Sequence, residues 1–119
     1  MNVVAGVIRK QDKLLLALRP SHKHHGDLWE FPGGKVASGE TNSVAICREI
    51  REELGLSVDA IEGELAKLVE GGLSITFIEV KVSGEVHLFE HQALAWCNRE
   101  EALNLALCPL DRRFMLEVL

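Results

Sequence analysis

Short runs of apolar residues, separated by turn-forming residues, extend along most of the chain. Apolar or alternating runs of about four to eight residues that end at polar, glycine or proline residues are typical of β-strands. The pattern predicts an opening hairpin, a short strand that stops in a turn at Pro32-Gly33-Gly34, a long hairpin turning at Gly71-Gly72, and a last strand. The predicted strands cover residues 3–8, 14–18, 29–31, 58–69, 73–82 and 92–97.

One segment in the middle of the chain is predicted to be an α-helix over residues 42–54. Thr41 is a good N-cap, and Gly55 suits the left-handed residue that ends many helices. At about 100° per residue, the helix has an apolar stripe and a charged stripe opposite it. We expect the apolar stripe to pack against the sheet. It holds Val44, Cys47, Ile50 and Leu54, and the opposite side holds Arg48, Glu49, Glu52 and Glu53.

Two shorter helices are predicted near the end of the chain. Asn98 and Glu101 resemble a capping box, and Pro109 precedes a final amphipathic helix over residues 111–119. The order β-β-β-α-β-β-β-α-α indicates an α/β fold with a mixed sheet between helices, an α/β/α sandwich. With 119 residues, 47% of them hydrophobic, the chain has the size of one domain, so we expect a single domain over residues 1–119.

Charge and composition narrow the function classes. The formal net charge is −5 and no run of lysines or arginines occurs, so the positive field that attracts nucleic acid polymers is missing. A polyphosphate ligand would therefore need metal ions. No apolar stretch approaches the roughly 20 residues that span a bilayer, and no signal-peptide pattern is present, so we expect a cytoplasmic protein without membrane contact. Cys47, Cys97 and Cys108 form no CxxC pair, which favours reduced thiols in or near the core.

The charged side of the predicted central helix indicates a specific chemistry. Glu49 lies three residues before Glu52 and four before Glu53, so three carboxylates are neighbours on the helix surface and repel one another. Oxygen-rich clusters of this kind suit hard ions such as Mg²⁺ or Mn²⁺, whereas zinc would favour nitrogen or sulfur ligands. Arg48 can hold one glutamate in place through a bidentate ion pair. A solvated acidic helix face is the alternative that the helix alone leaves open.

The wider segment resembles the Nudix box. It reads Gly34, five residues, Glu40, seven residues, and then the run REIREELGL from Arg48 to Leu56. The resemblance implies a hydrolase of nucleoside polyphosphates that uses Mg²⁺, or alternatively Mn²⁺, as its cofactor. Glycines before the box can bring bare backbone close to a metal or phosphate. The implied metal ligands are the Gly33 carbonyl, Glu49, Glu52, Glu53 and Glu90. The implied catalytic residues are Glu49, as the base or water-orienting group, together with Glu52, Glu53 and Arg48. Glu40 is implied to support this cluster.

Outside the box, Leu18-Arg19-Pro20 and the run WEFPGGK from Trp29 to Lys35 resemble the MutT-like branch. That branch converts nucleoside triphosphates, including oxidised guanine nucleotides such as 8-oxo-dGTP, to a nucleoside monophosphate and pyrophosphate. MutT proteins carry an asparagine that reads the base edge, where this chain has Asp111. An ionised carboxylate accepts from the exocyclic amine of cytosine or guanine but cannot donate, which keeps CTP or dCTP open as the substrate. The implied substrate-binding residues are Arg19, Phe31, Gly34, Lys35 and Asp111.

Several interpretations stay open at the level of sequence. Asp111 can instead cap the last helix, Arg19 can be a surface cation, and Phe31 can be a core aromatic residue. The His22-Lys23-His24-His25 stretch is expected to be a solvated loop, and His91 is a candidate to approach the substrate. A nucleotide-sensing module without catalysis is one alternative function, and an enzyme for nucleotide sugars or dinucleotide polyphosphates is another. The chain is expected to be a monomer or a homodimer.

Overall fold

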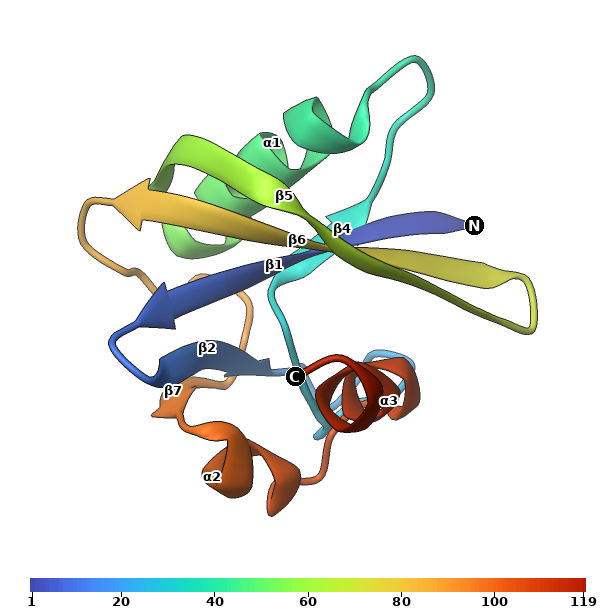
Figure 1. The fold of residues 1–119 in the computed structure, drawn as a ribbon, viewed down its shortest axis with the longest axis vertical. Coiled ribbons are helices and arrows are strands. Elements are labelled where there is room, and N and C mark those ends of the chain that lie inside the picture. The colour runs from blue at the N-terminus through green and yellow to red at the C-terminus, as the bar shows by residue number, and fades with distance from the viewer.

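The computed structural model describes all residues from 1 to 119 and contains a mixed sheet with helices on its two faces (Figure 1). The strands are β1 (Asn2–Lys10), β2 (Lys13–Leu18), β3 (Trp29–Glu30), β4 (Gly33–Lys35), β5 (Ser57–Glu70), β6 (Leu73–Ser83) and β7 (Ala93–Cys97). The helices are α1 (Asn42–Leu54), α2 (Arg99–Leu103) and α3 (Pro109–Glu117). The predicted α/β class is therefore confirmed.

Strand β1 connects the parts of the sheet. It pairs in parallel with β6, from Asn2 opposite Ser74 to Ile8 opposite Val80. It also pairs antiparallel with β4 and, at its end, with β2. The main path across the sheet is β3-β2-β1-β6-β5, and β7 adds to β2. Because one of these pairs is parallel and the others are antiparallel, the sheet is mixed, as predicted.

Two hydrophobic clusters fill the two faces of the sheet. The first lies under α1, where Ile50 packs with residues of β1 such as Ile8. The second lies under α3 and contains three aromatic rings: those of Phe77 and Phe114 are stacked with centroids 4.1 Å apart, and Phe31 meets both edge-on. Figure 1 shows α1 and α3 on opposite sides of β1, which confirms the predicted α/β/α sandwich.

Helix α1 begins and ends where its caps predict. The Thr41 hydroxyl accepts a hydrogen bond from the Val44 N–H at 3.2 Å. Gly55 adopts a φ of 70° and donates its N–H to the Arg51 carbonyl. Left-handed backbone of this kind carries no steric penalty for glycine, which explains the sharp end of the helix.

The predicted apolar stripe of α1 is confirmed at Ile50 and Leu54 but wrong at Val44, and Cys47 is only partly buried. The buried residues are Ala45, Ile46, Ile50 and Leu54, whereas Val44 is 55% exposed. The helix is therefore rotated so that its 46–50–54 row faces the sheet, and the neighbouring 45–49–53 row lies at the border of the packed face. As a consequence, Glu49 and Glu53 do not lie opposite the core but flank it.

The prediction that Pro32-Gly33-Gly34 only turns the chain is also wrong, because β4 begins at Gly33 and pairs with Val3, Val4 and Ala5 of β1. A Cβ at Gly33 would collide with the Val4 carbonyl oxygen, so this close approach of two backbones requires glycine. The ladder thus resumes directly after the proline, and it fixes the backbone of Gly33 and Gly34 next to α1.

The two C-terminal helices follow the sequence signals with one correction. The capping box of α2 is confirmed, since the Asn98 side chain accepts from the Glu101 N–H at 2.8 Å and the Glu101 side chain accepts from the Asn98 N–H at 2.9 Å. Helix α3 begins at Pro109 and not at Asp111, because Cys108 is the N-cap and proline suits the first helical position. The interpretation of Asp111 as a helix cap is therefore wrong.

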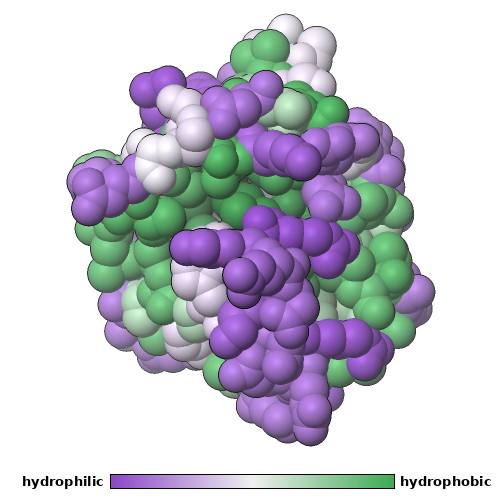
Figure 2. Space-filling view, turned by 60° about the vertical axis from the view of Figure 1, so that its left-hand side comes forward, coloured by the Kyte–Doolittle hydropathy of each residue, from purple (hydrophilic) through white to green (hydrophobic).

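The surface mixes hydrophilic and hydrophobic areas. On the face in Figure 2, a band of hydrophilic residues has hydrophobic residues on either side. Scattered apolar side chains at the surface are common in folded proteins and need no functional explanation. None of the three helices combines the length and the apolar character that a membrane crossing requires.

Candidate active site

Two adjoining cavities lie where β1, β4, α1 and the start of α3 meet the loop that connects β2 and β3. The larger has a volume of about 560 Å³ and the smaller about 360 Å³. The larger cavity is lined by nine of the predicted site residues: Arg19, Phe31, Gly33, Gly34, Lys35, Glu49, Glu53, Glu90 and Asp111. The structure thus brings together residues that are far apart in the sequence. Arg48, Glu40 and Glu52 are not part of the cavity lining.

The Arg48 guanidinium connects the acidic residues of α1 to the chain before the helix. Its Nε and Nη2 donate to the two carboxylate oxygens of Glu40, at 2.7 and 2.9 Å. Its Nη1 donates to Glu49 at 2.8 Å and to Glu52 at 3.2 Å, and Nη2 also donates to the Lys35 carbonyl at 3.0 Å. These contacts use all five N–H donors of the arginine. The hydrogen bonds from Arg48 lower the pKa of Glu40 to about 2, and Glu40 and Glu49 raise the pKa of Arg48.

Glu49 and Glu53 lie on the border of α1 that faces β4. The Gly33 N–H donates to Glu53 Oε1 at 2.9 Å. The Glu49 carboxyl carbon would be 2.5 Å from a Cβ at Gly34, so the absence of a side chain there makes room for this carboxylate. Burial raises the pKa of Glu53 to about 7, against the opposing charge of His91. The larger cavity therefore contains two neighbouring carboxylates whose negative charge the protein offsets only in part.

Three of the predicted site residues are more exposed. The Glu52 side chain is 58% exposed and contacts Arg48. The Glu90 side chain is 64% exposed, and Lys23 Nζ lies 3.5 Å from its carboxylate. Lys35 is exposed at the rim of the larger cavity. The structure thus places Glu52 outside the cavity, while Glu90 and Lys35 border it.

The donor set fits a hard divalent ion that keeps part of its water shell. No three histidine, cysteine, aspartate or glutamate side chains come together as a complete protein cage for an ion. Mg²⁺ does not need such a cage, because it is usually bound by one or two carboxylates together with waters and substrate phosphates. The carboxylates of Glu49 and Glu53 beside the backbone of Gly33 supply oxygen donors of this type.

Glu30, in the wall of the larger cavity, contacts Arg19, which also lines that cavity, and His91, which is buried and lines neither cavity. Arg19 Nη1 donates to Glu30 Oε1 at 2.9 Å, and His91 Nε2 donates to Glu30 Oε2 at 3.0 Å. Arg19 Nε donates to the His24 carbonyl at 3.0 Å, which leaves further N–H donors of the guanidinium for a ligand. Burial lowers the pKa of His91, but Glu30 and the charge of Glu53 outweigh it, so the pKa is raised. The other ring nitrogen, His91 Nδ1, is buried without a hydrogen-bond partner.

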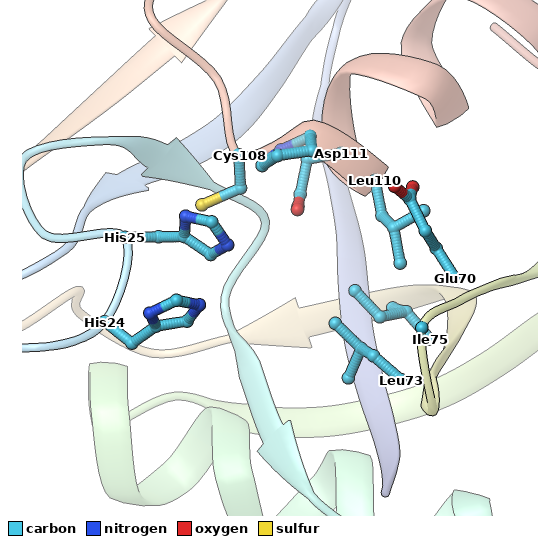
Figure 3. A pocket seen from close by; sticks show the side chains of 10 residues that line it. His24, His25, Glu70, Leu73, Ile75, Cys108, Leu110 and Asp111 are labelled. Atoms are coloured by element: carbon cyan, nitrogen blue, oxygen red, sulfur yellow. The ribbon is translucent and has the colours of Figure 1, made fainter.

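Asp111 is a buried carboxylate that borders both cavities. It is 4% exposed, and its Oδ2 accepts a hydrogen bond from the Phe31 N–H at 3.0 Å. Burial raises the pKa of Asp111 to about 7, although the Phe31 N–H acts in the opposite direction. Figure 3 shows its carboxyl group directed into the space between His25 on one side and Leu73 and Ile75 on the other.

Sequence reasoning missed two features of this site. Phe31 is 2% exposed and its ring packs in the aromatic core, as its interpretation as a core residue predicts. What the sequence did not indicate is that the Phe31 backbone N–H positions Asp111. Glu30 is not among the predicted site residues, yet it orients Arg19 and contacts His91. The signal that could have identified it is a single acid between two aromatic residues in a predicted strand.

Comparisons with known proteins found a matching family model, related sequences and similar solved structures. A family model described as "NUDIX domain" matches residues 1–118. The chain is 40% identical to CTP pyrophosphohydrolase of Escherichia coli K12 over 117 residues, which is 93% of this chain and 85% of the relative. It is 44% identical to 8-oxo-dGTP diphosphatase of Proteus vulgaris over 59 residues, 49% of this chain and 53% of the relative. The crystal structure of a MutT NUDIX hydrolase from Burkholderia pseudomallei is similar with a TM-score of 0.87 and 25% identity, covering 99% of this chain and 97% of that one.

Proposed function

Because the chain belongs to the Nudix hydrolase family, as a MutT-like hydrolase of phosphoric anhydride bonds, we propose that it is a Mg²⁺-dependent nucleoside triphosphate pyrophosphohydrolase. It converts a (d)NTP and water to a nucleoside monophosphate and pyrophosphate. Cytosine nucleotides, CTP or dCTP, are the preferred substrates, and 8-oxo-dGTP is the second candidate. Residues 1–119 act as a single cytoplasmic domain on this small molecule.

The observation that carries the proposal is the pair of carboxylates held side by side in the larger cavity. Arg48 holds Glu49, and the Gly33 N–H holds Glu53. A divalent ion would be held there by these two carboxylates and the Gly33 carbonyl, with Glu52 and Glu90 able to join from their exposed positions. When bound, the ion neutralises phosphate charge and lowers the pKa of a water molecule.

Glu49 is assigned to orient the attacking water and to accept its proton. Arg48 Nη1 occupies one carboxylate oxygen of Glu49, so the other is available to the water. The water oxygen bonds to the second phosphorus, and the bond from that phosphorus to the oxygen shared with the first phosphorus breaks. Negative charge develops on the departing nucleoside monophosphate, where Arg19 and Lys35 at the cavity wall offset it.

Recognition of the base is assigned to Asp111. Its Oδ2 is held by the Phe31 N–H, so Oδ1 is free to accept from an exocyclic amine. Cytosine presents such an amine at N4, and a carboxylate pairs with it. The similarity to a relative that bears the name CTP pyrophosphohydrolase over 93% of this chain supports the same choice.

A second candidate, 8-oxo-dGTP, is favoured by the burial of Asp111. Because the pKa of this carboxyl is raised to about 7, a protonated form that donates a hydrogen bond is accessible near neutral pH. A protonated carboxyl can donate to a carbonyl oxygen of a modified guanine, as a side-chain amide would. The similarity to the Proteus vulgaris protein named 8-oxo-dGTP diphosphatase supports this candidate over half of the chain.

The test is release of pyrophosphate versus phosphate from a panel of ordinary, methylated and oxidised (d)NTPs with Mg²⁺ at mildly alkaline pH. Fastest pyrophosphate release from CTP or dCTP is the expected result, and fastest release from 8-oxo-dGTP would favour the second candidate. If no triphosphate is cleaved but nucleotide with Ca²⁺ raises the melting temperature, the chain is a nucleotide-sensing module and the enzymatic proposal is wrong.

An Asp111→Asn variant tests the assignment of the base reader. The amide oxygen can still accept from the Phe31 N–H, which turns the NH₂ group toward the base. A donor would then face the N4 amine of cytosine, and we expect kcat/KM for CTP to fall about 10- to 100-fold while activity on 8-oxo-dGTP is maintained or rises. An equal effect on both substrates would contradict a role in base selection.

A further inference from the structure

Two adjacent histidines of the loop between β2 and β3 border the cavities without a role in the chemistry proposed above. His24 and His25 line both cavities, and their ring centroids are 4.0 Å apart at an angle of 44°. Figure 3 shows the His25 ring at the side of the smaller cavity, with Leu73 and Ile75 across from it. A flat ligand in this space would meet an imidazole on one face and aliphatic side chains on the other.

The loop that carries these rings is held by contacts along its whole length. The Asp27 N–H donates to the Arg19 carbonyl at 3.1 Å, and the Arg19 N–H donates to the Leu28 carbonyl at 2.9 Å. Gln92 Nε2, from the segment before β7, donates to Asp27 Oδ1 at 2.6 Å and to the Arg19 carbonyl at 2.8 Å. A Cβ at Gly26 would collide with backbone carbonyl groups of the same loop. The loop therefore has a defined conformation before a ligand binds, which reduces the entropy cost of binding.

His25 also has a backbone conformation that favours glycine. Its φ is 56°, in the left-handed region where residues other than glycine are uncommon and cost free energy. Backbone strain of this kind tends to occur at ligand-binding sites. A glycine at position 25 would relieve it, but the imidazole ring that faces the cavity would be lost.

We infer that His25, backed by His24, is the stacking surface for the nucleotide base, opposite Leu73 and Ile75. The inference rests on the proposed function, because a nucleotide base is the flat ligand that this substrate supplies. Aromatic side chains, histidine included, stack on the faces of bases and discriminate little between them. His25 therefore contributes affinity for any base, while the buried Asp111 in the wall of the same cavity selects the base by its edge.

The experiment measures the affinity of uncleaved nucleotides by calorimetry with Mg²⁺, using the α,β-methylene analogues of CTP and GTP and inorganic tripolyphosphate as a ligand without a base. The variants are His25→Asn and His25→Phe. Asparagine tolerates the left-handed conformation but has no aromatic ring, and phenylalanine keeps a ring. His22→Asn is the matched control, because His22 lies exposed in the same loop and lines neither cavity.

We expect His25→Asn to weaken both nucleotide analogues about five- to tenfold, with His25→Phe within about twofold of the parent. His22→Asn should bind like the parent protein, and tripolyphosphate should bind equally to all variants. Equal nucleotide affinity in His25→Asn and His22→Asn would overturn the inference. An equal loss for tripolyphosphate would do so too, because the loop would then act on the phosphates.

Turnover of CTP by the parent protein is measured separately. Nucleotide binding that depends on His25 without any turnover would overturn the proposed function and leave the stacking surface supported. Turnover of CTP together with an unchanged nucleotide affinity in His25→Asn would support the proposed function and overturn the stacking surface. Failure of the parent protein to bind either analogue would overturn both.

Discussion

A carboxyl group as deeply buried as that of Asp111 should make the protein less stable at alkaline pH. Burial raises its pKa from 3.8 to about 7 in the folded state. Between these two values the unfolded chain has lost the proton and the folded chain retains it, so the free energy of unfolding falls as the pH rises. A shift of about three pKa units corresponds to roughly 4 kcal/mol at pH 8, where the carboxylate is ionised in both states.

The Asp111→Asn variant removes this ionisation while it keeps an acceptor for the Phe31 N–H. We therefore expect the variant to be more stable than the parent protein by roughly 2 to 4 kcal/mol at pH 8, and about equally stable at pH 4. Because 1 kcal/mol shifts the melting temperature of a domain of this size by roughly 4 °C, the difference at pH 8 should be visible in a thermal scan as well.

The assay is urea unfolding of both proteins from pH 4 to pH 8 in the presence of a chelator. Glu40, with its lowered pKa, and Glu53, with its raised pKa, titrate in both proteins, so their effects cancel in the difference between the two curves. A stability difference that does not change with pH would refute the reasoning, since it would mean that Asp111 titrates in the folded state as it does in the unfolded chain.

Three further substitutions test the acidic border of α1. Glu52→Gln should lower kcat by orders of magnitude, because Glu52 is one of the implied metal ligands. The melting temperature should not change, because the Glu52 side chain is 58% exposed. An unchanged kcat would show that Glu52 is not a catalytic residue. Gly34→Ala places a Cβ 2.5 Å from the Glu49 carboxyl carbon, so kcat should fall at least tenfold with little change in KM, and an unaltered kcat would show that Glu49 is not needed where it lies. Glu40→Gln deprives Arg48 of its bidentate partner, so stability should fall at pH 7 and by much less at pH 2. At pH 2 Glu40 is half protonated in the folded parent and protonated in its unfolded chain, so most of its contribution is already lost, and circular dichroism melts at both pH values measure the difference.

The local signals in the sequence predicted the helices and most strands because their causes are local. Thr41 and Gly55 bound α1, and Asn98 caps α2, through hydrogen bonds that span only three or four residues. Even so, the predicted buried stripe of α1 included Val44 and left out Ala45 and Ile46. Val44 is apolar but exposed, and residue type alone does not reveal which of two neighbouring rows meets the sheet.

The sequence predicted which residues belong to the site, but it did not predict which of them contact one another. The hydrogen bond between Phe31 and Asp111 joins positions 80 residues apart, and the contact between Glu30 and His91 spans 61 residues. Such partners depend on how the strands pair, which no local pattern encodes. The motif likewise included Arg48 among the implied catalytic residues but gave no indication that all five of its donors are used.

The parallel pairing of β1 with β6 has a consequence for the synthesis of the chain. Asn2 leaves the ribosome about 70 residues before Ser74, its partner in the sheet, which corresponds to several seconds at typical translation rates of roughly 5 to 20 residues per second. Throughout this delay the most central strand of the sheet has an unpaired edge, which favours association with other nascent chains. Messages that end before the codons of β6 should therefore give insoluble products, and a slow stretch of translation within β5 should reduce the yield of folded protein.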